Sequence, residues 1–383
     1  MTNYSAYGEL GTLMPNLRVV DTGVIIDQSQ STTAQPSIET PVNVDARNTY
    51  GGVYAIDVFD ITPALSWSVS GRLNTAQISL ADRLGDTLNG DHGFTRFNPG
   101  TGLAYKFSDL LTAYAGYSES NRAPTASELS CADPNSPCLL DAFLVSDPNL
   151  KQVVSRDYEA GLRGGSGFDL LPGSFTWKAN FYRTDSANDI LLLATDINGF
   201  GYFQNSGTTR RQGADLNFGY TDDNWKLSAS YSYLDATFRS PQTLSSNSPA
   251  ADDNGLIYVQ PGDHIPMNPA NRLTLSGDRT ILPAWSVGVD VRLQSGEYLV
   301  GDDSNQVPKL PGYATVNLRT AYQIVAQFEV FGEIQNLLDR DYYTYGSFTQ
   351  LDGLPPNYNL SDPRTFSPAP GRLFFAGVRS AFQ

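Results

Sequence analysis

Apolar and polar residues alternate along strand-length segments throughout the C-terminal half of this chain. In residues 227–233 the odd positions hold Leu227, Ala229, Tyr231 and Tyr233, and every position between them is a serine. Side chains of an extended strand point alternately to two faces, so one face here is apolar and the other hydroxylated. The pattern recurs in residues 65–74, 177–181, 215–220, 285–294 and 316–322. Such a repeat, with aromatic residues near strand ends, indicates an antiparallel transmembrane β-barrel with lipid outside and water inside.

Charged residues keep to the polar face of these segments. Asp290 and Arg292 share their face with Ser286 and Gln294, whereas the valines between them point the other way. An Arg or Lys that faces lipid at the bilayer midplane costs about 2–4 kcal/mol. This separation of charge is therefore a stronger sign of a barrel than hydrophobicity itself.

Composition fits this interpretation and narrows the function classes. No window approaches the 18 or so consecutive apolar residues of a transmembrane helix, and mean hydropathy is −0.29. The net charge of −15 argues against nucleic-acid binding, which needs a basic patch. The acidic pairs Asp252-Asp253 and Asp302-Asp303 match no calcium-loop pattern, so they are expected to be solvated loop residues rather than a cation site.

Cys131 and Cys138 are the only cysteines, and they flank a short segment with two prolines. A disulfide is expected between them, with free thiols as the alternative. Such a bond fits an oxidising compartment or the cell exterior and would contribute about 2–3 kcal/mol. A metal site would need more ligands than the nearby sequence offers.

Residues 1–48 are the least regular part and form a poorly defined segment with possible first strands, and residues 49–383 form the barrel portion. Strands are expected at 50–61, 64–80, 94–106, 110–119, 155–165, 173–186, 188–195, 200–205, 208–220, 224–238, 270–281, 284–297, 313–323, 325–336 and 371–382. The connections alternate between short turns and long loops. In an outer-membrane barrel the short turns face the periplasm and the long loops are extracellular.

Seven segments, in the same order as in that family, resemble motifs of TonB-dependent outer-membrane receptors. They are 121–129 (NRAPTASEL), 147–152 with 158–163 (DPNLKQ and YEAGLR), 203–213 (FQNSGTTRRQG), 264–273 (HIPMNPANRL), 310–318 (LPGYATVNL), 331–342 (FGEIQNLLDRDY) and 370–379 (PGRLFFAGVR). Each match alone is weak, but their order over roughly residues 50–382 is specific.

The resemblance implies a 22-strand barrel in the outer membrane of a Gram-negative bacterium, filled by an N-terminal plug whose short box binds TonB. Members bind ligands between the outer loops and the plug, and most import ferric siderophores. Others import haem, cobalamin, nickel complexes or glycans. The barrel assembly machinery reads a C-terminal aromatic residue in this family, and here Phe382 is followed by Gln383.

The sequence departs from the family pattern in several ways. No plug, TonB box or secretory signal is recognisable, and only about 14–16 strands of the 22 are expected. Two unpaired edges would remain, which lipid cannot satisfy. We therefore expect a fragment or truncated product, with a smaller closed barrel or half of a split receptor as alternatives, and contact with TonB only through a plug outside this chain. Residues 125–146 contain no histidine, which lowers the rank of haem, and His92 and His264 are expected on surface loops.

Two groups of rim residues are candidates for ligand contact. Arg122 and Glu128 flank a Pro-Thr turn and could pair, order the cysteine loop or touch ligand. Tyr342, Tyr343 and Tyr345 crowd one long loop, where they could stack on a catecholate or sugar or form an interfacial belt.

A third group is expected to face the lumen and to contact a plug or solvent. It comprises Arg72, Lys178, Asp215, Asp290, Arg292 and Arg319. Asn336 and Asp339 are expected as turn formers where a strand ends.

An enzyme is not expected, because no nucleophile elbow, phosphate loop or zinc-protease motif is present and two isolated histidines give little material for a triad. No cofactor or metal is expected. The leading hypothesis is the barrel part of a receptor for a metal chelate, most readily a ferric siderophore. The alternatives are a passive or structural outer-membrane barrel that does not transport, and a soluble β-rich binding protein.

Overall fold

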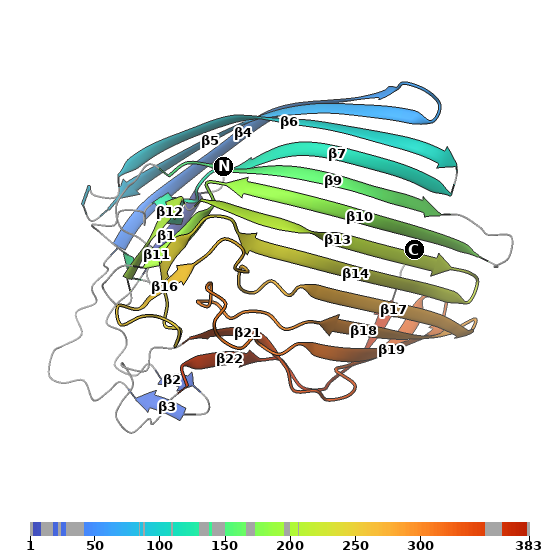
Figure 1. Ribbon diagram of the computed structural model, residues 1–383. Coiled ribbons are helices and arrows are strands. Elements are labelled where there is room, and N and C mark those ends of the chain that lie inside the picture. Colours follow the sequence, from blue (N-terminus) through green and yellow to red (C-terminus); the bar gives the residue numbers. More distant parts are fainter. Residues whose placement is uncertain are drawn as a thin grey trace.

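A single curled sheet dominates the computed structural model of this chain (Figure 1). The structure describes residues 3–8, 18–21, 24–27, 42–83, 85–86, 89–108, 110–129, 138–139, 150–165, 173–194, 200–205, 207–348 and 362–380. The sheet has 14 strands, and all of its neighbouring strands are antiparallel. The predicted all-β antiparallel fold is confirmed.

The strands of this wall follow one another in chain order. They are β1 (Asn3–Gly8), β4 (Val42–Asp60), β5 (Leu65–Asp82), β6 (Gly90–Ser108), β7 (Leu111–Arg122), β9 (Val153–Gly165), β10 (Ser174–Ala187), β13 (Thr208–Thr221), β14 (Trp225–Phe238), β17 (Asn271–Leu282), β18 (Trp285–Gln294), β19 (Tyr313–Val325), β20 (Phe328–Gln335) and β23 (Leu373–Ser380). Apart from the one-turn helix α1 (Ala126–Leu129), the described residues are strands and connections. No helix among them has the length and apolar character to cross a bilayer.

The two ends of the wall differ in their connections. Short turns join the strands at what we call the turn end, on the right of Figure 1. Polar side chains close these turns: Thr62 Oγ1 accepts the N–H of Leu65 at 3.0 Å, and Asp222 Oδ1 accepts the N–H of Trp225 at 2.7 Å. The opposite, loop end carries the long connections and small elements. The latter include the hairpins β2 (Arg18–Asp21)–β3 (Val24–Asp27), β15 (Gln242–Ser245)–β16 (Leu256–Val259) and β21 (Tyr343–Phe348)–β22 (Arg364–Pro368).

The register places apolar and polar residues in separate rows. Val291 is paired with Leu275 and Val316, whereas the next residue, Arg292, is paired with Thr274. The polar rows line the hollow of the curl, where a cavity of about 920 Å³ is bounded by residues such as Ser70 of β5. We call the face toward this hollow the inner face and the other the outer face.

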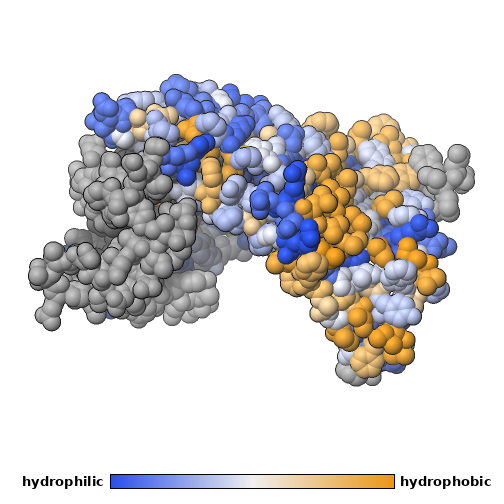
Figure 2. Space-filling model, turned by 90° about the horizontal axis from the view of Figure 1, so that it is seen from below, coloured by the Kyte–Doolittle hydropathy of each residue, from blue (hydrophilic) through white to orange (hydrophobic). Residues whose placement is uncertain are grey.

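Apolar side chains on the outer face remain exposed instead of filling a dry centre. Val289 is 39% exposed and Phe218 is 46% exposed. Figure 2 shows the apolar surface gathered on the half of the molecule nearer the turn end. The two clusters of buried apolar residues both lie toward the loop end, around Ile78 and Leu129 and around Phe238 and Ile257. The wall is thus not built around a central hydrophobic core.

All four tryptophans lie on the outer face within a few residues of the turn end. They are Trp67, Trp177, Trp225 and Trp285. The indole N–H of Trp67 donates to Thr101 Oγ1 at 2.9 Å, and that of Trp285 donates to Thr320 Oγ1 at 2.8 Å. Each of these two indole nitrogens thus has a hydrogen-bond partner on the adjacent strand. Amphipathic rings of this kind suit a boundary between apolar and aqueous surroundings.

Two features of the wall bear on the sequence-based expectations. The segments 188–195 and 200–205 form β11 (Ile190–Ala194) and β12 (Phe200–Asn205), which pair with each other and with β8 (Cys138–Leu139) in a separate sheet. They are therefore not wall strands, because they belong to a loop-end connection. The wall itself is open, since β23 has a partner only in β20 and β4 beyond Arg47 only in β5 among the described residues.

Candidate functional site

The inner face between β6 and β13 carries a polar surface with two cations over one tyrosine. The Lys178 ammonium lies 5.5 Å from the ring centroid of Tyr114, and the Arg163 guanidinium lies 5.7 Å from it. Tyr114 donates its hydroxyl to Asn180 Oδ1 at 2.8 Å. The ring lies against the wall because Gly161 has no side chain there: a Cβ at that position would be 2.6 Å from Tyr114 Cζ. This arrangement leaves positive charge facing the hollow.

Arg319 is held flat on the inner face by a polar network from three strands. Its Nε donates to Asp278 Oδ1 at 3.0 Å, its Nη2 donates to Asp278 Oδ2 at 2.7 Å and to Ser276 Oγ at 3.1 Å, and its Nη1 pairs with Asp290. A Cβ on Gly288 would lie 2.6 Å from Arg319 Nε. Arg319 and Asp290, both predicted as lumen residues, are therefore brought together in one ion-pair network with Asp278.

The other predicted lumen residues have different surroundings. Arg72 donates to Asn74 Oδ1 at 2.5 Å and lies 5.8 Å from the Tyr54 ring centroid. Asp215 accepts the Ser232 hydroxyl at 2.7 Å. Arg292 is exposed and forms no ion pair with any described residue. The cations that remain unneutralised on this face therefore include Arg292 and Lys178.

Arg122 and Glu128 form a pair at the loop end of β7. Arg122 Nη1 lies 2.7 Å from Glu128 Oε2, which also accepts the N–H of Thr125 at 2.7 Å, while Thr125 Oγ1 accepts the N–H of Glu128 at 3.2 Å. This reciprocal arrangement is a capping box at the start of α1. It seats Leu129, which is fully buried, against Ile78. Of the alternatives stated for this pair, pairing is observed, and ligand contact remains a prediction.

The three rim tyrosines do not converge on one site. The Tyr342 ring packs on Tyr313 with centroids 4.4 Å apart, and the Tyr343 ring packs on Phe366 at 5.2 Å. Tyr345 is 42% exposed. The expected turn formers behave as predicted, because Asn336 and Asp339 have φ of 49° and 51° and Asn336 Oδ1 accepts the N–H of Arg340 at 3.0 Å.

A second cluster at the loop end was not anticipated from the sequence. The His264 ring stacks on Tyr298 at 5.8 Å between centroids, and the Lys309 ammonium lies 4.3 Å from the same Tyr298 ring. Asn305 ties the segment to the neighbouring loop, since its Oδ1 accepts the N–H of His264 at 2.5 Å. No sequence signal joined these residues, because His264 precedes the pair of strands β17 and β18, whereas Tyr298, Asn305 and Lys309 follow it.

The expectation that Asp302 and Asp303 are solvated is wrong: Asp303 is only partly exposed, and the larger departure is at Asp302. Its side chain is fully buried and accepts the N–H groups of Gln306 at 2.9 Å and Val307 at 3.1 Å, which compensates part of the cost of burial. Burial raises the pKa of the Asp302 carboxyl and raises that of Asp303 to about 6, and repulsion from Asp302 adds to the shift of Asp303.

The disulfide predicted between Cys131 and Cys138 lies outside the described side chains. Within the described part of the chain no group of three or more His, Cys, Asp or Glu side chains is arranged to hold a metal ion.

Comparison with known proteins places these features in a family. The profile "TonB dependent receptor-like, beta-barrel" matches residues 4–337. The metal-pseudopaline receptor CntO of Pseudomonas aeruginosa is 28% identical over 212 residues, which is 54% of this chain and 27% of CntO. The ferric-pyoverdine M114 receptor PbuA of Pseudomonas sp. is 27% identical over 273 residues, which is 69% of this chain and 29% of PbuA.

Solved structures share the fold at low identity. The ferric-catecholate import receptor Fiu of E. coli K12 superposes with a TM-score of 0.64 at 17% identity, over 89% of this chain and 46% of Fiu. The siderophore receptor PiuA of Acinetobacter baumannii superposes with a TM-score of 0.65 at 18% identity, over 88% of this chain and 44% of PiuA. The chain thus spans under a third of these curated relatives and under half of these solved chains. The two-faced antiparallel wall and the profile match together show that this chain belongs to the TonB-dependent receptor β-barrel family.

Proposed function

We propose that this chain forms the barrel wall of an outer-membrane receptor that imports a metal chelate, with a ferric siderophore as the leading ligand. The relatives named above carry the names of receptors for metal-pseudopaline and ferric-pyoverdine, and the family consists of receptors and transporters rather than enzymes. The single observation that carries the proposal is the wall itself, with exposed apolar rows on the outer face and charges on the inner face.

The proposed seating in the membrane follows from the same two faces. Exposed apolar side chains would contact lipid, and the tryptophans at the turn end would lie at the periplasmic interface. The long connections would then face the outside of a Gram-negative cell. Assembly would rely on the barrel assembly machinery reading the C-terminal strand β23, as the family resemblance implies.

A plug from the rest of the receptor is the proposed occupant of the hollow. The inner face of β4 presents Tyr54, Ile56 and Val58 at 68%, 65% and 58% exposure. Apolar side chains in an aqueous bore gain stability when another surface covers them. We therefore place the plug against β4, with TonB acting through that plug.

Ligand contact is assigned to the rim and to the unneutralised inner cations. Arg122, Tyr342, Tyr343 and Tyr345 lie toward the loop end, where an incoming chelate arrives first. Lys178 lies deeper on the inner face, whereas Arg292 lies near the loop end of β18, and both would attract an anionic chelate. The Cys131–Cys138 disulfide would restrain the loop that follows α1.

Iron-limited growth tests this function directly. Cells with the intact gene, without it, and without it but complemented would be grown on ferric hydroxamate, catecholate and mixed chelates, with and without TonB. The receptor proposal requires TonB-dependent loss of growth on at least one chelate when the gene is removed. Equal growth on all chelates, with the protein present in outer-membrane fractions, would favour the passive-barrel alternative instead.

A further inference from the structure

The outer face changes from apolar to polar along one line across β17 and β18. On β18 the outward residues are apolar from Trp285 to Leu293, and the next outward residue is Ser295. On β17 the last apolar outward residue is Leu273, and Asn271 follows. The eight residue-to-residue steps from Trp285 to Leu293 rise about 27 Å along the strand, or about 21 Å in height at a tilt of about 40°. The line thus lies near the outer edge of an apolar band that is about 25 Å tall.

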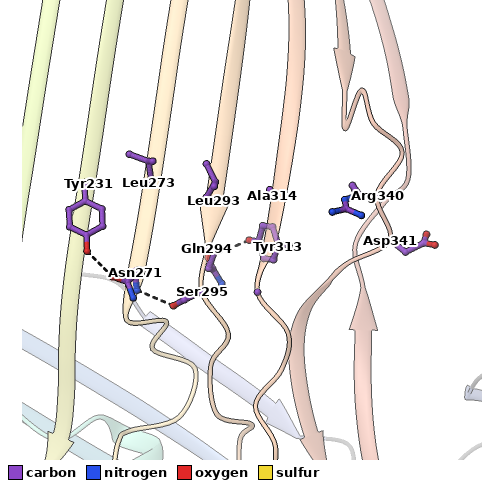
Figure 3. Close-up of a pocket in the computed structure, with 11 residues that line it drawn as sticks. Tyr231, Asn271, Leu273, Leu293, Gln294, Ser295, Tyr313, Ala314, Arg340 and Asp341 are labelled. Atoms are coloured by element: carbon purple, nitrogen blue, oxygen red, sulfur yellow. Dashed lines mark hydrogen bonds between the residues drawn. The ribbon is translucent and has the colours of Figure 1, made fainter.

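A cavity of about 570 Å³ lies on this line (Figure 3). Its apolar part is formed by the outward residues Leu273, Leu293 and Ala314. Its polar part includes Asn271 and Ser295, together with Tyr231 and Arg340. The Tyr231 hydroxyl donates to Asn271 Oδ1 at 2.7 Å, and Ser295 Oγ accepts the N–H of Asn271 at 3.0 Å, so the polar rim is ordered before any ligand arrives.

The turn after β20 places Arg340 at the edge of this cavity. Asn336, in the left-handed region at φ 49°, accepts the N–H of Arg340 at 3.0 Å and donates to its carbonyl at 2.9 Å. The Arg340 side chain is exposed and has no ion-pair partner among the described residues. Figure 3 shows its guanidinium on the side of Ala314 and the Asp341 carboxylate directed away. The backbone of Arg340 is thus held beside an apolar surface, and its exposed guanidinium is available there.

We propose that this cavity binds the phosphorylated glucosamine headgroup and adjoining acyl chains of an outer-leaflet lipid A. The acyl chains would lie on Leu273, Leu293 and Ala314, while sugar hydroxyls would meet Asn271 and Ser295. Arg340 would bind a phosphate, for which the planar guanidinium is well suited. A hydroxyl-rich headgroup with phosphate matches this rim better than a phospholipid headgroup does. The site rests on the outer-membrane location proposed above and is independent of the imported chelate.

Native mass spectrometry of the protein extracted from outer membranes tests this site. Bisphosphorylated lipid A, the same lipid without phosphates, and phosphatidylglycerol would be titrated against wild type, Arg340→Gln and Ala314→Trp. Arg340→Gln is expected to weaken binding of bisphosphorylated lipid A about tenfold, as for one lost charge-assisted contact, and to leave the dephosphorylated lipid unchanged. Ala314→Trp fills the cavity and is expected to weaken both.

The matched control is Arg279→Gln, which removes an outward arginine at the opposite edge of the band, 4.9 Å from the Trp225 ring. It is expected to bind lipid A as the wild type does. Equal effects of Arg340→Gln and Arg279→Gln, or equal binding of phosphatidylglycerol and lipid A by the wild type, would overturn the proposal. Chelate-dependent growth of the same variants is expected to stay unchanged, so failure of this site is distinguishable from failure of the receptor function.

Discussion

Asp303 shows how one carboxyl can make a loop sensitive to pH. Burial raises its pKa from 3.8 to about 6. A carboxyl whose pKa is higher in the folded state stabilises that state at low pH, and the contribution is lost as pH rises through about 6. Hydrogen exchange at Asn305, Gln306 and Val307, corrected for intrinsic rates, is expected to slow between pH 7.5 and 5. Asp303→Asn should remove the part of this change centred near pH 6, and identical profiles for both proteins would refute it.

Glu128 has two tasks that substitutions can separate. Glu128→Ala removes both the capping box and the Arg122 ion pair, and it is expected to destabilise the α1 region by about 1 kcal/mol. Arg122→Gln removes only a half-exposed ion pair, so its expected cost is a few tenths of a kcal/mol. Hydrogen exchange of the Leu129 amide, which is bonded to the Thr125 carbonyl at 3.0 Å, would measure both. A larger effect of Arg122→Gln than of Glu128→Ala would contradict this division.

Among single residues, some contacts could be predicted from the sequence and others could not. The Thr125-x-x-Glu128 spacing is a capping signature that was present to be read. The left-handed turns at Asn336 and Asp339 followed from local side-chain chemistry. Burial of Asp302 did not: its hydrogen-bond partners Gln306 and Val307 are close in sequence, but its burial depends on tertiary packing that local pattern does not report.

Among the elements, β17, β18 and β19 are joined by a side-chain network as well as by backbone pairing. Gly288→Ala would place a Cβ 2.6 Å from Arg319 Nε and also against Asp278. Overpacking of this kind typically costs about 1–3 kcal/mol. Gly332→Ala is the matched control, because the nearest atom to its Cβ would be 3.7 Å away. Denaturant unfolding in detergent should separate the two variants, and equal midpoints would argue against the network.

Strand existence was predictable from alternation, but strand partnership was not. The segment around β11 and β12 has strand-like composition, and yet these strands pair with β8 outside the wall. β15 and β16 form a hairpin inside one of the long connections, where no strand was predicted. The alternation of apolar and polar residues shows that a strand has two different faces. Which strand pairs with it depends on loop closure and on contacts distant in sequence.

For the whole molecule, the decisive quantity is the free-energy cost of placing a charge on the outer face compared with the inner face. Val289→Arg puts a cation on the outer face midway between Trp285 and Leu293, and it is expected to cost about 2–4 kcal/mol in a bilayer. Ser230→Arg puts the same charge on the exposed inner face and is expected to cost well under 1 kcal/mol. Reversible unfolding from lipid vesicles would compare them. Equal losses would mean that both faces meet the same solvent.

The tryptophans, gathered at a single rim, give the molecule a fixed reference depth. All four indoles of the chain sit near the short turns, so none anchors the opposite rim. When a bilayer thickens, the anchored rim would hold its level and the mismatch would accumulate at the far side. In a thicker membrane the lipid headgroups would then lie closer to the hairpins at the loop end. In a thinner membrane those hairpins would lie farther out in the water.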